Sequence, residues 1–256
     1  MNKQEKVMSH PVVELFEIEP DIIQVKMQDR VHKNAFSKEL TRGLIQSFEL
    51  IQASSSYKVV ILTGYDSYFA TGGTQEGLLR IQQGITNFTD DNIYSLALDC
   101  PIPVIAAMQG HGIGGGFVMG LFADLVVLSR ESVYTTNFMK YGFTPGMGAT
   151  FIVPQKLGLS LAQELLLTAS NYRGAELEKR GIPFAVLPRQ QVMDHALELA
   201  RQLAEKPRNS LITLKDHLVA PLRAQISRVV EQEIIMHEKT FHQAEVKDRI
   251  AQLYGN

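Results

Sequence analysis

Cysteine, long apolar runs and an excess of charge of either sign are all scarce in this sequence. A single cysteine, Cys100, excludes an internal disulfide and fits a reducing, cytoplasmic setting. There is no stretch of 18 apolar residues, and the N-terminal segment has acidic residues without an apolar run. We therefore expect neither a membrane-spanning helix nor a signal peptide. A net charge of −2 gives no indication of a nucleic-acid or anionic-membrane partner.

Short apolar runs alternate with helical periodicity through the first part of the chain. Strands are expected at 12–18, 22–27, 59–62, 104–107 and 125–128, with helices beginning at Ser37 and near Glu76. Beyond about residue 155 the strong signals are helical, at 160–168, 174–180, 190–205, 209–218 and 225–242. The pattern predicts an α/β core over residues 1–190 and a C-terminal helical subdomain over 191–256.

Two segments share the order of strand, glycine turn and helix start. The first runs from Tyr68 to Thr74 and contains Gly72-Gly73, and the second runs from Gly110 to Phe117 and contains Gly114-Gly115-Gly116. Glycine allows close approach of a ligand to the backbone, and a helix start leaves N–H groups without partners. Two such starts that converge would form an oxyanion hole. Either segment alone is equally consistent with tight packing of a helix on a strand.

Together these segments resemble the crotonase (enoyl-CoA hydratase/isomerase) family. The family pattern is matched by Phe69-Ala70-Thr71-Gly72-Gly73-Thr74, by the Gly114-Gly115-Gly116 run, by Ala123-Asp124-Leu125 and by the segment from Gly142 to Thr150. The resemblance implies a crotonase fold, in which repeated β-β-α units form a spiral core and C-terminal helices mediate trimerisation. It also implies that Gly73 and Gly115 donate the two oxyanion N–H groups to an acyl thioester.

Two positions depart from the hydratase members of this family. Hydratases have a glutamate two residues after the glycine run and a second one before the Pro-Gly turn, and these orient water and move protons. The matching positions here are Val118 and Phe138. Without either acid we expect no hydration, and this side of the site is predicted to be apolar and dry.

The departures resemble a smaller branch, the decarboxylases of polyketide β-branching, which are also described as polyketide enoyl-CoA isomerases. In that branch a C-terminal histidine carries proton transfer, and the matching residue is His237. On helical spacing His237 lies on the apolar stripe of Ile226, Val230, Ile234 and Phe241, so a hydrogen-bonded core histidine is the alternative. The resemblance further places Ala70, Arg80, Val118 and Phe138 around the substrate.

One further departure concerns lysine. The branch has a lysine soon after the first glycine turn that holds the substrate carboxylate, whereas this sequence has no lysine between Lys58 and Lys140. From residue 59 to 129 the only Lys or Arg is Arg80. The sequence therefore leaves open what binds a carboxylate.

The function that the resemblance implies is decarboxylation of a 3-methylglutaconyl-type thioester through a dienolate. The substrate would be carried on the phosphopantetheine of an acyl carrier protein or on CoA, with no metal or redox cofactor. The expected partners are the carrier protein and copies of this chain in a homotrimer or a dimer of trimers, in the cytoplasm. Two alternatives stay open, an enoyl thioester isomerase that releases no CO₂ and a non-catalytic scaffold that docks carrier proteins.

Overall fold

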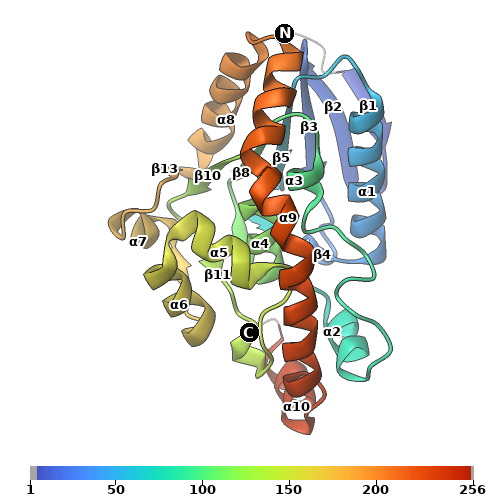
Figure 1. Cartoon of the computed structure of the whole chain (residues 1–256), viewed down its shortest axis with the longest axis vertical. Helices are drawn as coiled ribbons and strands as arrows, with labels where there is room; N and C mark the ends of the chain where they lie inside the picture. The colour runs from blue at the N-terminus through green and yellow to red at the C-terminus, as the bar shows by residue number, and fades with distance from the viewer. Residues whose placement is uncertain (1–4, 255–256) are drawn as a thin grey trace.

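The computed structural model describes residues 5–254, in which a seven-stranded sheet is covered by helices on both faces (Figure 1). Its strands are, in spatial order, β1 (Glu5–Ser9), β2 (Val13–Glu19), β3 (Ile22–Met27), β5 (Val59–Thr63), β8 (Val104–Met108), β10 (Leu125–Ser129) and β13 (Ala185–Leu187). The first three strands are antiparallel, and those from β3 onward are parallel. The α/β architecture predicted from the sequence is confirmed.

Smaller sheets lie beside the main one. Four short strands pair in the order β12 (Tyr172–Arg173), β11 (Val133–Thr135), β9 (His111–Ile113) and β6 (Tyr68–Ala70), while β4 (Ala35–Phe36) pairs with β7 (Gly72–Gly73). Each of β5, β8 and β10 leads into a strand of the four-stranded sheet, namely β6, β9 and β11. This repetition is the predicted spiral of β-β-α units, and it brings successive turns of the chain to the same edge.

Helices fill the connections and form the C-terminal part of the chain. They are α1 (Lys38–Ala53), α2 (Gln75–Gln82), α3 (Leu96–Asp99), α4 (Gly115–Leu121), the 3₁₀ helix η1 (Met139–Tyr141), α5 (Ala149–Leu157), α6 (Leu159–Thr168), α7 (Gly174–Lys179), α8 (Arg189–Ala204), α9 (Arg208–Thr240) and α10 (Ala244–Leu253). Ser37 caps α1 as expected, because its side chain accepts a hydrogen bond from the Leu40 N–H.

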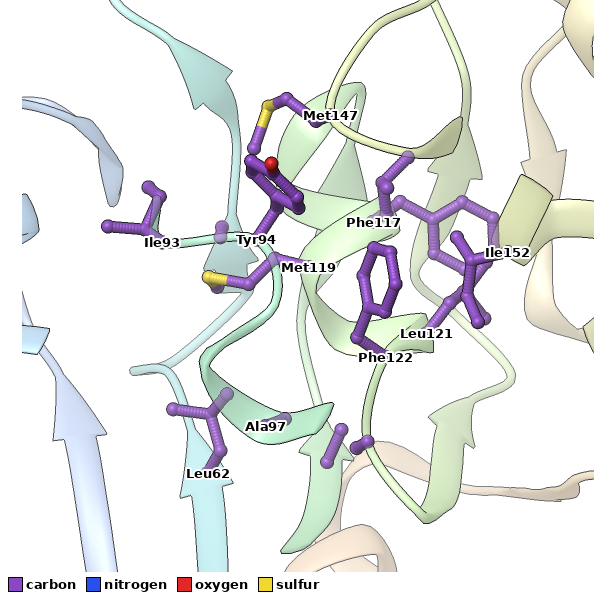
Figure 2. Close-up of a cluster of buried hydrophobic side chains, with 14 of the residues drawn as sticks. Leu62, Ile93, Tyr94, Ala97, Phe117, Met119, Leu121, Phe122, Met147 and Ile152 are labelled. Atoms are coloured by element: carbon purple, nitrogen blue, oxygen red, sulfur yellow. The ribbon is translucent and has the colours of Figure 1, made fainter. Parts of the chain in front are cut away.

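Alternation along the central strands assigns their side chains to two cores. In β5, Val60 and Leu62 face the large core that includes α1, whereas Val59 and Ile61 face a smaller core beneath α8. A strand buried on both faces has no polar positions, which explains the continuous apolar run in the sequence. Figure 2 shows the large core around α4, where Phe117 and Phe122 pack with residues from other elements.

The longest helix differs from its sequence prediction. Separate helices were expected at 209–218 and 225–242, yet α9 is continuous from Arg208 to Thr240 with Pro221 inside it. Proline removes one backbone donor, but buried residues on both sides of it, Val219 and Val230, hold the two halves of α9 on the large core. Figure 1 shows α9 running along much of the molecule.

The C-terminal helices contact different parts of the molecule. Helix α8 begins at Arg189, next to the predicted domain boundary, and packs on β5, β8 and β10, while α10 packs on α2. The division of the chain at residue 190 stays a prediction. No helix within residues 5–254 is long and apolar enough to cross a membrane.

Candidate active site

A cavity of about 940 Å³ opens between the glycine turns, α2 and the C-terminal half of α9. Five of the seven site residues predicted from the sequence line it: Gly73, Arg80, Gly115, Phe138 and His237. They come from segments as far apart as β7 and α9, and the fold brings them to one site.

The other two predicted residues lie behind the cavity wall. Ala70 and Val118 are fully buried and do not line the cavity. The carbonyl of Ala70 packs against Gly116 so closely that a Cβ there would lie 2.2 Å from the oxygen. Val118 belongs to the large core. The prediction that these two side chains line the substrate site is therefore corrected, and of the two apolar replacements only Phe138 reaches the cavity.

The two glycine turns meet as predicted. Strand β6 pairs with β9, with Ala70 opposite Gly112, so the turns that follow these strands are adjacent. A Cβ on Gly72 would lie 3.1 Å from the Gly115 nitrogen, and Gly72 has a φ of +78°, which side chains rarely adopt. The sequence needs glycine here for both backbone conformation and close approach.

Each turn leads to the start of a helix. Gly115 is the first residue of α4, so its N–H is among those that have no partner within the helix. Gly73 ends β7, and Thr74 then caps α2 by accepting a hydrogen bond from the Gly77 N–H at 3.0 Å. Both Gly73 and Gly115 border the cavity. Their placement is compatible with an oxyanion hole, and the assignment of the two donors stays a prediction.

His237 lies on α9 with its ring enclosed by aromatic side chains. Ring centroids of Phe88, Phe241 and Phe143 are 4.9, 5.1 and 6.0 Å away. Its Nε2 atom is 2.8 Å from the Thr144 carbonyl oxygen. A carbonyl can only accept a hydrogen bond, so Nε2 carries the proton and Nδ1 is left as the basic nitrogen of the neutral ring.

Burial sets the charge of this histidine. The aromatic surroundings lower the pKa of His237 to about 4, against an ordinary value of 6.5. The pKa lies below the ordinary value because desolvation outweighs the hydrogen bond to Thr144. The ring is therefore neutral at pH 7 in the free protein.

Charged groups on the cavity wall are exposed or half-buried. Arg80 on α2 and Lys140 in η1 are half-buried, and Lys33 and Lys38 are exposed. The carboxylates that line the cavity are all exposed and comprise Glu39, Glu76, Asp90 and Asp91. None of these acids occupies the position of Phe138, so the described wall beside His237 is aromatic.

Three contributors to the site were missed in the sequence. The Tyr254 hydroxyl donates a 2.9 Å hydrogen bond to the Gly73 carbonyl. Thr144 supplies the carbonyl that fixes His237, and Glu233 binds the loop that contains Thr144. Of the three, only Glu233 could have been identified from the sequence, because it is spaced by three and four residues from Val230 and His237 on the apolar stripe.

Within residues 5–254, no group of three or more His, Cys, Asp or Glu side chains has an arrangement that could hold a metal ion.

Comparison with known proteins identifies the family. The sequence model of the enoyl-CoA hydratase/isomerase family matches residues 17–254. The chain therefore belongs to this family, which is the crotonase family, and the predicted resemblance is confirmed.

Individual relatives show which members of the family this chain is similar to. The chain is 78% identical to the bacillaene synthase decarboxylase PksI of Bacillus subtilis (strain 168), over 97% of this chain and all of the relative. A solved structure from a dehydratase/decarboxylase enzyme couple involved in polyketide β-branching matches with a TM-score of 0.97 and 76% identity, over 98% of this chain and 100% of that one. The decarboxylase domain of CurF from Lyngbya majuscula matches with a TM-score of 0.91 and 46% identity, over 95% and 99%. The predicted similarity to the decarboxylase branch is confirmed.

Proposed function

We propose that this enzyme decarboxylates a 3-methylglutaconyl-type thioester on an acyl carrier protein in polyketide β-branching. The observation that carries the proposal is one cavity that combines two abutting glycine turns with His237 in an aromatic wall. The decarboxylases described above, at 46–78% identity over nearly the whole chain, support the same reaction.

The glycine turns would stabilise the charge that develops on the substrate. When the bond to the carboxylate carbon breaks, its electron pair moves through the conjugated double bond to the thioester oxygen, and neutral CO₂ leaves. The N–H groups of Gly73 and Gly115 would donate to that oxygen, and one such donor is worth about 3–4 kcal/mol. Phe138 would keep water away from the dienolate, which favours loss of charge as CO₂.

His237 would return a proton to the dienolate carbon and thereby set the double-bond position. The free ring is neutral, so it must gain a proton before it can act as an acid. A substrate carboxylate beside the ring would raise the pKa of His237, because an opposite charge favours the imidazolium. The imidazolium would thus help to hold the carboxylate, with Arg80 on the same cavity as a further cation.

The carrier protein would present its substrate at the cavity mouth. Lys33 and Lys38 are exposed on the cavity wall and could pair with the phosphate of a phosphopantetheine arm. We further propose a cytoplasmic enzyme that forms a trimer or a dimer of trimers, with residues 191–256 as the trimerisation subdomain. Exposed leucines on α9, Leu214 and Leu218, support an interface there.

Mass spectrometry of carrier-bound 3-methylglutaconyl thioester tests the reaction. Incubation with enzyme should lower the mass of the acyl group by the mass of CO₂. Crotonyl thioester in a parallel reaction should gain no water. Movement of the double bond without loss of CO₂ would instead identify an isomerase. An unchanged substrate would favour a docking scaffold and contradict the proposal.

A further inference from the structure

Glu233 is a buried glutamate whose carboxylate accepts hydrogen bonds from the loop of residues 142–148 and the residues that follow it. Of the buried acidic side chains within residues 5–254, it is the one that binds this loop, which contacts His237. It lies on α9 and has no solvent exposure. Its Oε2 accepts from the Gly148 N–H at 2.7 Å, and its Oε1 accepts from the Thr150 N–H at 2.9 Å and the Thr150 hydroxyl at 2.6 Å. All three donors belong to the loop of residues 142–148 or to the start of α5 that follows it.

The loop of residues 142–148 contacts both the His237 ring and the glycine turn that contains Gly115. The Thr144 carbonyl accepts the hydrogen bond from His237 Nε2. Gly146 packs on the same ring, since a Cβ there would lie 2.9 Å from the His237 Cε1 atom. Met147 packs on the glycine turn, because a Cβ on Gly115 would lie 2.5 Å from the Met147 Sδ atom. A shift of this loop would therefore move the partner of the histidine and the wall of the glycine turn together.

Glu233 and His237 are four residues apart on one helix, so they lie on the same face. The carboxylate fixes the loop to α9 one turn before the histidine, and the loop then returns to contact the histidine. This closed arrangement ties the Thr144 carbonyl to the helix that carries His237, and the Thr240 hydroxyl of the same helix also bonds the Thr144 N–H and hydroxyl, at 3.3 and 3.0 Å.

We propose that Glu233 is a positioning residue that sets the tautomer and orientation of His237 through the 142–148 loop. The inference rests on the proposed function only for its effect on turnover. Glu233 does not contact the substrate directly, because it does not line the cavity. A buried carboxylate is costly to desolvate, and burial accordingly raises the pKa of Glu233. Hydrogen bonds from three donors offset that cost.

Glu233→Gln tests this assignment with little change of volume. A glutamine amide has one acceptor oxygen, so its NH₂ group must face one of the three donors, and at least one backbone N–H loses its acceptor. Val219→Ala is the matched control, since Val219 is also buried on α9 but is far along the helix from the loop and does not line the cavity. His237→Gln assigns the imidazole signals.

Nitrogen-15 NMR of labelled histidine gives a readout that needs no substrate. We expect wild type and Val219→Ala to hold the Nε2–H tautomer at His237, and Glu233→Gln to show a mixture of tautomers. The kcat of Glu233→Gln should fall on the order of 10²-fold, the scale of a displacement of about 1 Å at a reacting group, while KM changes much less. An unchanged tautomer together with the turnover of Val219→Ala would overturn the proposal.

A second variant decides the case in which Glu233→Gln does not fold. Thr150→Val keeps the carboxylate and the Thr150 position but removes the 2.6 Å hydroxyl donor. A partial tautomer change at His237 supports the positioning role, and a wild-type histidine spectrum overturns it. If the wild-type protein releases no CO₂ while Glu233→Gln still alters the tautomer, the proposed function fails and the positioning role stands.

Discussion

At the scale of single residues, Gly115 and Gly116 are adjacent but meet different neighbours. A Cβ on Gly115 would meet the end of the flexible Met147 side chain at 2.5 Å, whereas one on Gly116 would lie 2.2 Å from the Ala70 backbone carbonyl. The Met147 side chain can move away, whereas the Ala70 carbonyl belongs to a paired strand and cannot. A substitution at Gly115 therefore tests function, and a substitution at Gly116 tests packing.

Gly115→Pro should fold and lose most of its turnover. Proline is tolerated at the first position of a helix, where the N–H has no helical partner, and it deletes the proposed oxyanion donor. Loss of one such donor lowers kcat by about 10²–10³-fold. Gly116→Ala should instead lower the melting temperature. Thermal unfolding and turnover measured on both variants check this, and near-normal turnover of Gly115→Pro would remove Gly115 from the oxyanion hole.

His237→Ala should lower turnover by about 10²–10⁴-fold, the usual range for general acid–base catalysis. Thioester affinity should change much less, because the glycine turns remain, and water would protonate the dienolate with less selectivity. The products should then include more than one double-bond position, as measured by NMR of the released acyl group. His237→Gln serves as the comparison that keeps a side-chain donor for the Thr144 carbonyl. A folded His237→Ala protein with wild-type turnover would assign the proton donor elsewhere.

His237 also gives stability a pH dependence of defined sign. The unfolded chain protonates this histidine near pH 6.5 and the folded protein only near pH 4. Between these values the unfolded state binds more protons, so the free energy of unfolding falls as pH falls through this window. The separation corresponds to about 3 kcal/mol.

Comparison with His237→Gln isolates this contribution by urea unfolding at pH 7 and pH 4.5. The comparison is needed because the raised pKa of Glu233 acts in the opposite sense, removing stability as pH rises above its ordinary value of 4.5. We expect wild type to lose more stability than His237→Gln on acidification. Equal losses would mean that the ring is protonated in the folded protein.

At the scale of elements, α10 closes the site from the C-terminal end. It packs on α2, and Tyr254 just beyond it bonds the Gly73 carbonyl and borders the cavity. A C-terminal element thus restrains a turn almost two hundred residues earlier in the chain, on the glycine that is proposed to bind the thioester oxygen.

Tyr254→Phe should loosen that turn while it leaves the ring in place. Loss of one hydrogen bond costs about 1 kcal/mol of stability, and turnover should fall because Gly73 is less firmly held. Tyr172→Phe is the matched control, since the Tyr172 hydroxyl bonds Glu164 outside the cavity. Urea unfolding and turnover of both variants are the measurements. A turnover loss as large in Tyr172→Phe as in Tyr254→Phe would contradict a specific effect on Gly73.

At the scale of the whole molecule, large apolar side chains remain exposed on the outer helices. Leu159 and Leu167 of α6 are 64% and 70% exposed, and Leu214, Leu218 and Ile235 of α9 are 57%, 64% and 56% exposed. Scattered apolar residues are normal on a surface, but Leu214 and Leu218 lie four residues apart on one helix face. The spacing gives this face of α9 an apolar stripe.

Analytical ultracentrifugation should find a trimer or a dimer of trimers at micromolar concentration. Leu214→Asp combined with Leu218→Asp should shift the protein towards smaller species, because each charge would be buried in an apolar contact. Glu164→Gln on the surface serves as the control that should not change the assembly. A stable monomer of the wild-type protein would contradict the expectation.

The sequence by itself determined five strands of the main sheet (β2, β3, β5, β8 and β10), the glycine turns and the helical stripe that carries His237. These features depend on local chemistry, such as the apolar run of Val59 to Leu62 or the backbone freedom of Gly72. Pattern reasoning failed for Pro221, because contacts of distant residues keep α9 continuous there, and for Ala70 and Val118, because their direction depends on how β6 and α4 pack.

Only the tertiary structure decided how the site is assembled. Thr144, Glu233 and Tyr254 contribute through contacts with residues 83 to 181 positions away, and no sequence spacing encodes such pairings. The pKa of His237 was likewise decided by burial, because Phe88 and Phe143 come from segments far along the chain, whereas only Phe241 lies at the end of the same helix. Desolvation depends on everything that surrounds a group in space, whereas the sequence specifies only its neighbours along the chain.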